Sequence, residues 1–210
     1  MTFSGWRSVP TALAVSLLIA CSKSTADSSR ITPEYDKKTG KLQLLKYDSN
    51  GDGKVDMWSY MDGSRFVRIE IDTDGDGKPD RWEHYGPDQK IVKVGASRQN
   101  DGREDAWSYA DADGNIIRIE ISTRRDGRIS RVERYSHGSL TAAEEDTDGD
   151  GAIDKWETYE GERLVMVAFD TSHRGRPDRR LIYAADGTVR TEIDPDGSGR
   201  FRPADTVPSR

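Results

Sequence analysis

The sequence contains one cysteine and few apolar residues. Because Cys21 has no second cysteine to pair with, an internal disulfide is excluded. Hydrophobic residues make up 33% of the 210 residues, whereas compact domains usually reach about 45–50% on a count that includes glycine. Even with the 20 glycines added, the chain stays slightly below that range. A thick two-layer core is therefore not expected, and the composition favours a thin or elongated structure.

The sequence also lacks a basic stripe, a phosphate-binding loop and a cluster of histidine and cysteine. With a net charge of −6 it has no excess of lysine and arginine for neutralising phosphates, so we expect no nucleic-acid partner. The histidines, His84, His137 and His173, stand apart in the sequence and do not form the His/Cys set typical of zinc sites. No glycine-rich phosphate loop precedes a helix. We find no constellation that requires an enzyme, and an envelope enzyme is the least favoured interpretation.

The N-terminal segment has the pattern of an export signal. Arg7 precedes an apolar run over residues 12–20, which is shorter than the ~20 residues that a membrane-spanning helix needs. The run ends in Leu18-Ile19-Ala20-Cys21, which resembles the bacterial lipobox. The resemblance implies that residues 1–20 are a lipoprotein signal peptide and that acylated Cys21 anchors the chain to a lipid bilayer. An ordinary signal peptide with an incidental cysteine is the alternative.

The resemblance to lipoproteins also implies a location. Ser22 stands where an aspartate would be the usual signal for retention in the inner membrane, so we expect the outer membrane. Residues 21–32 are rich in serine, threonine and small residues, which predicts a flexible tether. An exported chain would meet calcium at about millimolar concentration, at which even weak oxygen sites are filled.

An aspartate-rich loop recurs along the rest of the chain. Seven copies follow one another at a spacing of 24 or 25 residues, which is typical of repeat architectures. The copies begin at Asp48, Asp72, Ser97, Ser122, Asp146, Asp170 and Asp194. Between loops lie an aromatic segment such as residues 57–60, a turn such as Asp62-Gly63, and an alternating apolar and polar segment such as residues 67–71. Alternation predicts strands, and two strands around Asp-Gly predict a hairpin.

We therefore predict an all-β fold, a tandem array of about six or seven β-hairpin repeats of 24–25 residues. A lone hairpin is barely stable in water, so neighbouring units must share a face in an elongated twisted sheet or a solenoid. The array is expected over residues 33–202, after an N-terminal signal helix. It opens with an extra hairpin over residues 35–47, and residues 203–210 are expected to be a C-terminal tail.

The copy over residues 72–83 has the strongest chemical signal. Acidic side chains occupy its positions 1, 3, 5, 9 and 12, and Gly77 occupies position 6. So many carboxylates in a short loop are unfavourable without a cation, and calcium accepts several carboxylates at flexible distances. The segment resembles the calcium loops of EF-hands, dockerins and thrombospondin type 3 domains. The resemblance is confined to the loop, because no flanking segment shows helical spacing.

Three copies are complete at positions 1, 3, 5 and 9, and we predict that they bind Ca²⁺ with help from the carbonyl at position 7. The candidate ligands are Asp48, Asn50, Asp52, Lys54 and Asp56; Asp72, Asp74, Asp76, Lys78 and Asp80; and Asp146, Asp148, Asp150, Ala152 and Asp154. Glu83 and Glu157 at position 12 are further candidates. They rank below the aspartates because strand alternation turns position 12 to the face opposite position 9. The alternative is a set of Asp-Gly turns without metal, although a turn needs only one or two such residues.

The other copies have lost ligands. Gln99, Asp101 and Asp105 remain in the copy at Ser97, which leaves at most weak binding; the copy at Ser122 has arginine and serine at positions 3 and 9. In the copy at Asp170, Arg174 stands at position 5, and we expect its guanidinium to replace calcium by donating to the remaining carboxylates. The copy at Asp194 is expected to be empty.

Tryptophan recurs at loop position 11, as Trp58, Trp82, Trp107 and Trp156. In the preferred interpretation these indoles cover the β-branched residues as a core; in the alternative they form an exposed ladder for a glycan or a protein. Two functions follow. The first is a calcium-stabilised structural and interaction scaffold at the cell envelope. The second is a calcium-dependent adhesin or glycan-binding module.

Overall fold

The computed structural model describes residues 28–204. They form one open sheet of 15 antiparallel strands, in which every strand pairs with its neighbours in sequence. The elements are a 3-10 turn η1 (Ser28–Arg30), β1 (Ile31–Tyr35), β2 (Leu42–Tyr47), β3 (Met57–Asp62), β4 (Arg65–Ile71), β5 (Arg81–Tyr85), β6 (Ile91–Ala96), β7 (Ala106–Ala110), β8 (Ile116–Ile121), β9 (Arg131–Ser136), β10 (Ser139–Glu145), β11 (Lys155–Glu160), β12 (Arg163–Phe169), β13 (Arg179–Tyr183), β14 (Val189–Ile193) and β15 (Arg202–Pro203). The predicted all-β array of tandem hairpins is confirmed, and it is an elongated twisted sheet. The expected signal peptide, its helix and Cys21 lie outside the described residues.

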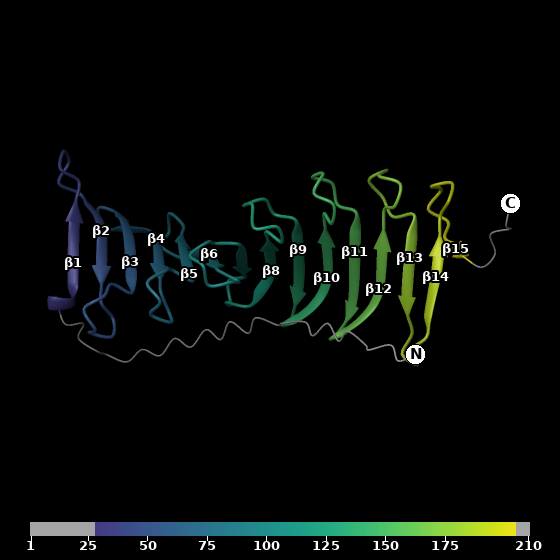
Figure 1. Cartoon of the computed structure of the whole chain (residues 1–210), viewed down its shortest axis with the longest axis horizontal. Coiled ribbons are helices and arrows are strands. Elements are labelled where there is room, and N and C mark those ends of the chain that lie inside the picture. Colours follow the sequence, from purple (N-terminus) through teal and green to yellow (C-terminus); the bar gives the residue numbers. More distant parts are fainter. Residues whose placement is uncertain (1–27, 205–210) are drawn as a thin grey trace.

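Connections of two kinds alternate along the chain. A short turn follows each odd-numbered strand up to β13, and an aspartate-rich loop follows each even-numbered strand. Because neighbouring strands run in opposite directions, all the loops lie at one set of strand ends and the short turns lie at the other. We call these two long sides of the sheet its loop edge and its turn edge. Figure 1 shows the loops on the lower side near β1 and on the upper side near β15, so the sheet turns over along its length. Sheets twist in this way because of the chirality of their strands.

Register shifts on the turn side of the hairpins add to the twist. They occur between Tyr60 and Met61 in β3, between His84 and Tyr85 in β5, and between Thr158 and Tyr159 in β11, among other places. A bulge of this kind raises the local right-handed twist and bends its strand. The repeated bulge therefore explains why a single sheet of this length is not flat.

The pairing register gives the sheet two distinct faces. Trp58 pairs with Glu70, which pairs with Trp82, whereas Ser59 pairs with Ile69. Since successive residues of a strand point to opposite faces, the tryptophans share one face with Glu70. Ile69 and Ile71 lie on the other face, as do Ile119 and Ile121. The prediction that the indoles cover the β-branched residues is wrong. We call the two sides the tryptophan face and the isoleucine face.

Aromatic and charged side chains pack against one another on the tryptophan face. Arg68 lies over the ring of Tyr60, with Cζ 4.5 Å from its centroid, and Arg118 lies over Tyr109 at 4.1 Å. Trp82 is buried, whereas Trp58, Trp107 and Trp156 are half-buried. The apolar side chains that are buried in the sheet are few and mostly small, as the low hydrophobic content predicts: Ile69, Trp82, Ala106, Ala143, Val167 and Ala168.

Both ends of the array differ slightly from the expected boundaries. β1 begins at Ile31, inside the expected tether, and pairs with Tyr47. Pro203 belongs to β15 and pairs with Glu192, so the sheet continues into the first residue of the expected tail. In the described part of the chain, no helix is long and apolar enough to cross a membrane.

Candidate metal centres

Backbone hydrogen bonds stack the loops at a fixed spacing. The N–H of position 1 in one loop donates to the carbonyl of position 9 in the preceding loop, as from Asp72 to Asp56 at 2.8 Å and from Asp170 to Asp154 at 2.9 Å. The residues at position 1 are correspondingly buried, with 6% exposure for Asp72 and 7% for Asp146, whereas Asp80 and Asp154 at position 9 are half-buried. The carboxylates at positions 1 and 9 are therefore built into the edge of the sheet.

The loop that begins at Asp72 turns its carboxylates inward. Asp72 accepts hydrogen bonds from the N–H groups of Gly75 and Gly77 at 2.8 and 2.7 Å. Gly77 has a φ of 90°, which only glycine adopts without strain. Asp80 accepts the N–H of Thr73 at 2.8 Å. As a result, Asp72, Asp74 and Asp80 each place one carboxylate oxygen within 4.8 Å of the other two.

The loop that begins at Asp146 repeats this geometry. Asp146 accepts the N–H groups of Gly149 and Gly151 at 2.5 and 3.0 Å. Its carboxylate oxygens form a group with those of Asp148 and Asp154, again within 4.8 Å of one another. The two loops whose sequences are richest in aspartate thus form the same cluster.

These clusters could hold a metal ion. An ionised carboxylate has about four lone-pair sites. Asp72 uses two of them for the N–H groups of Gly75 and Gly77, so about half of its acceptor capacity remains. The four carboxylates and one lysine of residues 72–80 leave a net charge of −3. The lysine, Lys78, lies 3.8 Å from Asp76. No ion pair reaches Asp72, Asp74 or Asp80 within residues 28–204, so this cluster has no cation of its own.

The third predicted loop has the same turn but fewer charges. Asp48 accepts the N–H groups of Gly51 and Gly53 at 2.6 and 2.9 Å. Asn50 stands at position 3, and its side-chain oxygen accepts the N–H of Asp52 at 2.8 Å. Hydrogen bonds from Ser49 hold the pKa of Asp56 below its usual value and keep that carboxylate ionised. The carboxylates of this loop are not among the close groups of three found in the described residues.

The remaining predicted ligands are distributed unevenly. Asp76 and Asp150 at position 5 lie outside the clusters formed by positions 1, 3 and 9. Asp76 instead pairs with Lys78, and Asp150 forms a second group with Asp148 and His173. The carbonyls at position 7 belong to Lys54, Lys78 and Ala152, whose N–H groups each bond to the carboxylate at position 5.

The glutamates at position 12 lie elsewhere. Glu83 accepts hydrogen bonds from Arg81 at 3.0 Å and from the Tyr85 hydroxyl at 2.8 Å. Glu157 forms ion pairs with Arg131 and with Lys155, each at 2.7 Å, and accepts a hydrogen bond from the Tyr159 hydroxyl at 3.0 Å. The structure therefore places both glutamates in charge networks on the isoleucine face and does not bring them into the aspartate clusters.

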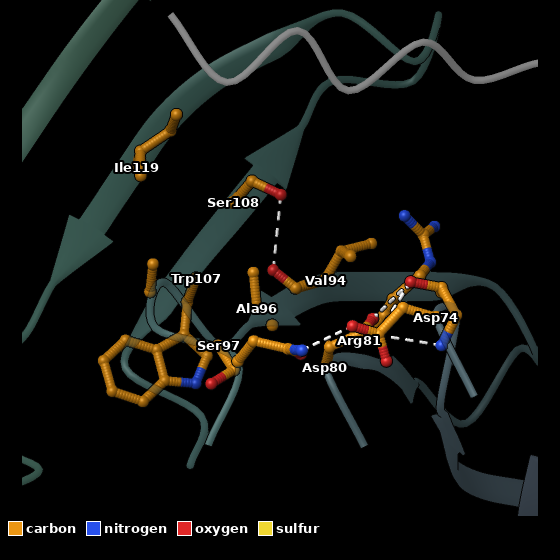
Figure 2. A pocket seen from close by; sticks show the side chains of 13 residues that line it. Asp74, Asp80, Arg81, Val94, Ala96, Ser97, Trp107, Ser108 and Ile119 are labelled. Carbon is orange, nitrogen blue, oxygen red and sulfur yellow. Dashed lines mark hydrogen bonds between the residues drawn. The ribbon is translucent and has the colours of Figure 1, made fainter. Parts of the chain in front are cut away.

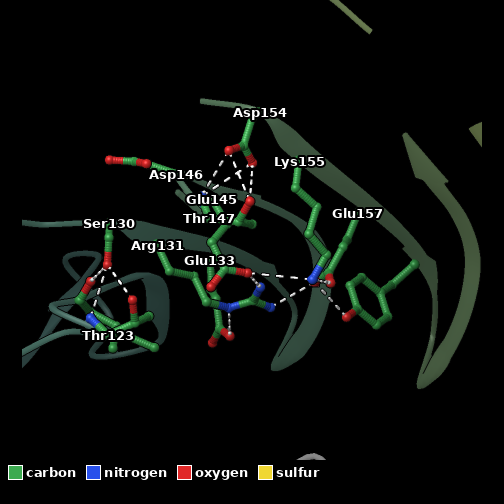
Figure 3. A network of polar contacts seen from close by, with 12 residues as sticks. Thr123, Ser130, Arg131, Glu133, Glu145, Asp146, Thr147, Asp154, Lys155 and Glu157 are labelled. Atoms are coloured by element: carbon green, nitrogen blue, oxygen red, sulfur yellow. Dashed lines mark hydrogen bonds and ion pairs between the residues drawn. The ribbon is translucent and has the colours of Figure 1, made fainter. Parts of the chain in front are cut away.

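Arg131 is the centre of the largest of these networks. Its guanidinium contacts Glu133 at 2.8 Å, Glu145 at 3.1 Å and Glu157 at 2.7 Å, from three different strands (Figure 3). Burial opposes ionisation of Glu157, but hydrogen bonds from Arg131 and Lys155 outweigh it and lower its pKa. The same network raises the pKa of the Tyr159 hydroxyl, mainly through burial and the charge of Glu157, to about 12.

Position 4 holds functional candidates that sequence reasoning missed. It is glycine in four loops, but Asn100, Arg125 and His173 occupy it in the other three, with φ values of 53°, 59° and 52°. Each of these side chains reaches back to the preceding loop. The signal available in the sequence was the loss of glycine where the chain needs a positive φ.

Arg125 supplies a cation to the loop at Ser97. Its guanidinium contacts Asp105 at 2.8 Å, Asp101 at 2.5 Å and the side-chain oxygen of Gln99. The hydrogen bond from Arg125 lowers the pKa of Asp101. Asp105, at 2% exposure, is among the most buried side chains of the described residues. The positive charge that balances the loop at Ser97 therefore comes from the next loop of the chain.

Arg174 acts within its own loop, as its position suggested. Its Nε donates to the hydroxyl of Ser172 at 2.6 Å, and its Nη2 lies 3.6 Å from Asp178. Burial would raise the pKa of Asp178, but hydrogen bonds from Ser172 and Thr171 lower it. Arg174 thus stands beside the acidic residues that remain in this loop.

A shallow hollow of about 550 Å³ adjoins the loop at Asp72. The small residues Gly95, Ala96 and Ala106 leave this space in the sheet. Figure 2 shows Asp74 and Asp80 at one side of the hollow and Trp107 at the other. Open space therefore lies next to the carboxylates of Asp74 and Asp80.

Comparisons with known proteins add little about function. No protein-family model matches the chain, and no curated protein matches it. Among solved structures, a mutant of S. aureus TarM in complex with fondaparinux, alpha-GlcNAc-glycerol and UDP overlaps 48% of this chain and 19% of its own, with 14% identity and a TM-score of 0.38. Accessory secretory protein 1, 2 and 3 of Streptococcus pneumoniae overlaps 67% of this chain and 19% of its own, with 13% identity and a TM-score of 0.26. The chain spans about a fifth of each structure, and these overlaps support no inference about function.

Proposed function

We propose that the protein is a calcium-binding lipoprotein of the bacterial envelope, anchored through acylated Cys21 to the outer membrane. Its hairpin array acts as a scaffold that presents the sheet to a protein or glycan partner. Calcium bound in the aspartate loops fixes the edge of the sheet and limits movement between hairpins. The observation that carries the proposal is the pair of three-carboxylate clusters at Asp72 and Asp146.

The chemistry of the clusters favours calcium over other cations. All the predicted side-chain ligands in the loop at Asp72 are oxygens, which hard cations prefer, and calcium tolerates more ligands and longer distances than magnesium does. Asp72, Asp74 and Asp80 would hold the ion, with Asp76 and the carbonyl of Lys78 as further donors. At the loop edge of a single-layer sheet, repulsion among these carboxylates would otherwise loosen the joint between β4 and β5.

The test is a calcium titration of the purified protein after treatment with EDTA. Trp82 is buried and lies two residues after Asp80, so ordering of the loop should change its fluorescence, and the melting temperature should rise. In the double variant Asp74→Asn/Asp76→Asn, the response of this loop should disappear. The matched control is Asp113→Asn, in an exposed turn at the opposite edge. If calcium shifts neither fluorescence nor melting in the unmodified protein, the proposal is overturned.

A calcium-dependent adhesin or glycan-binding module is the second candidate. It is favoured by one observation: within residues 28–204 no second layer covers the sheet, and Trp58, Trp107 and Trp156 are only half-buried on the tryptophan face. Aromatic side chains contribute much of the energy of many interfaces. Trp107→Ala should abolish binding in a glycan or envelope-protein binding assay if this face is the binding surface. Unchanged binding would point to another part of the scaffold.

A further inference from the structure

His173 lies between two loops of the array. It occupies position 4 of the loop between β12 and β13, and its φ of 52° turns the side chain toward the preceding loop. There its Nδ1 lies 3.7 Å from Asp148 Oδ2 and 3.8 Å from Asp150 Oδ2. The three ligand atoms all lie within 4.8 Å of one another, and they come from two repeats.

The separations are those of ligands around an ion rather than of hydrogen-bonded groups. A contact of 3.7 Å is too long for a hydrogen bond. The equivalent side chains behave differently, because Asn100 donates to Asp74 at 2.5 Å and Arg125 donates to Asp105 at 2.8 Å. Ligands bound at about 2.0–2.2 Å in a tetrahedral site are about 3.4 Å apart. The distances from His173 to both carboxylates are close to that value.

The donor set selects the metal. Calcium and magnesium bind through oxygen, whereas imidazole nitrogen suits zinc and related transition metals. Two carboxylates and one imidazole provide three protein ligands, and the fourth position of a tetrahedral site remains for water. The side chains are 44%, 50% and 62% exposed for Asp148, Asp150 and His173, so both ion and water have access.

We propose that Asp148, Asp150 and His173 form a site for a divalent transition metal of the zinc class, bridging two consecutive repeats. The site is distinct from the calcium cluster of Asp146, Asp148 and Asp154, although the two share Asp148. Its selectivity comes from the imidazole, which is not part of the calcium cluster. A bound metal would tie the loop after β12 to the loop after β10.

The chain contains a matched control for this site. The loop at Asp72 has the same carboxylates at positions 1, 3, 5 and 9, but the side chain that reaches it from the next loop is Asn100 instead of histidine. The variant His173→Asn converts the proposed site into that arrangement. Asparagine tolerates the left-handed backbone conformation well, so the variant should keep its fold.

The experiment titrates the purified full-length protein with Zn²⁺ in a calorimeter and with Co²⁺ in an absorption spectrometer. We expect binding with a cobalt ligand-field band in the unmodified protein, and binding about tenfold or more weaker, without that band, in His173→Asn. Asn100→His in the His173→Asn background should restore a site at Asp74 and Asp76. Equal Zn²⁺ binding by the unmodified protein and His173→Asn, or none in either, would overturn the proposal.

The calcium response separates this proposal from the proposed function. Calcium titrated into His173→Asn should give the same change in tryptophan fluorescence as in the unmodified protein, because the loop at Asp72 is untouched. A variant that loses zinc but keeps calcium supports the bridging site. A protein that binds zinc through His173 but shows no calcium response would overturn the calcium proposal alone.

Discussion

The loops at Asp72 and Ser97 are adjacent copies of one motif, and they balance their charge in opposite ways. The first has three clustered carboxylates, Asp72, Asp74 and Asp80, without a cation among them. The second has Asp101 and Asp105, and Arg125 of the next loop pairs with both. The backbone turn is similar, so the difference lies in the source of the positive charge. The first loop could take a cation from solution, whereas the second receives one from the chain.

The same distinction extends to the faces of the sheet. On the isoleucine face, Glu133, Glu145 and Glu157 surround Arg131, so these carboxylates are also neutralised from within. Of the two clusters in intact loops, the one at Asp72 has no ion pair within residues 28–204, whereas Arg124 lies 3.7 Å from Asp146 in the other. Calcium should therefore control particular joints of the array rather than the whole sheet.

Removal of Arg131 should have the largest effect. Arg131→Gln leaves three carboxylates without their shared partner, and breaking a buried ion pair costs about 3–5 kcal/mol. Urea unfolding should show this loss equally with calcium and with EDTA, because the network lies outside the loops. The control Arg128→Gln removes an exposed arginine nearby and should change little. If calcium restored the unfolding free energy of Arg131→Gln, the network on the isoleucine face would not be independent of calcium in the loops.

Removal of calcium from a single loop should have the next largest effect. A ligand at a hundredfold excess over its Kd stabilises the folded state by about 2.7 kcal/mol per site. EDTA should therefore lower the unfolding free energy by about that amount for each loop that binds. Scanning calorimetry of the unmodified protein and of Asp74→Asn/Asp76→Asn measures the share of the loop at Asp72. An identical calcium shift in both proteins would show that this loop is not occupied.

Exchanging asparagine and arginine at position 4 should exchange the calcium responses of the loops at Asp72 and Ser97. Asn100→Arg brings a guanidinium toward Asp74, so the loop at Asp72 should lose its calcium response. Arg125→Asn removes the guanidinium that contacts both Asp101 and the buried Asp105. Only Arg98, 3.5 Å from Asp105, then remains as a cation, so the melting temperature should fall in EDTA and partly recover in calcium. Arg103→Asn, which removes an exposed arginine from the same loop, is the control. If Arg125→Asn melts like the control, the arginine does not compensate these carboxylates.

The smallest effect is the pH dependence of the Arg131 network. The pKa of Glu157 is lowered in the folded state, so its contribution to stability is present above the unfolded pKa of about 4.3 and is lost as the pH falls through the folded value. Measured in EDTA, the difference in unfolding free energy between the unmodified protein and Glu157→Gln should shrink as the pH falls below about 4. The exposed Glu162 gives the control variant Glu162→Gln, whose difference should stay near zero. A difference that does not change with pH would contradict the ion-pair origin.

Most of the fold followed from the period of the sequence. Alternation such as Val67, Ile69 and Ile71, together with turn residues at regular intervals, predicts the hairpins and their order. The pairing of tryptophan with the β-branched residues did not follow. Position 11 of a loop and the alternating segment of the same repeat lie on neighbouring strands, and only the register decides which of their residues share a face.

The site was predicted in part for a similar reason. Spacing within one loop identified Asp72, Asp74 and Asp80, because close neighbours in sequence must lie close in space. Spacing could not show that Arg125 and His173 reach the preceding loop, since those contacts join residues about one repeat apart. It also could not place Glu157, whose partner Arg131 lies on another strand.

The repeat, the hairpins and the aspartate turns can be read from the sequence, since each depends on local backbone preferences and on the period of the side chains. Which carboxylates have a cation beside them depends on how the strands pair. Strand pairing stacks the loops along one edge, and that stacking brings position 4 of one repeat against the acids of the repeat before it. Opposite charges attract through space whatever their separation in sequence. The positive charge beside Asp101 and Asp105 is therefore that of Arg125, which belongs to the next repeat.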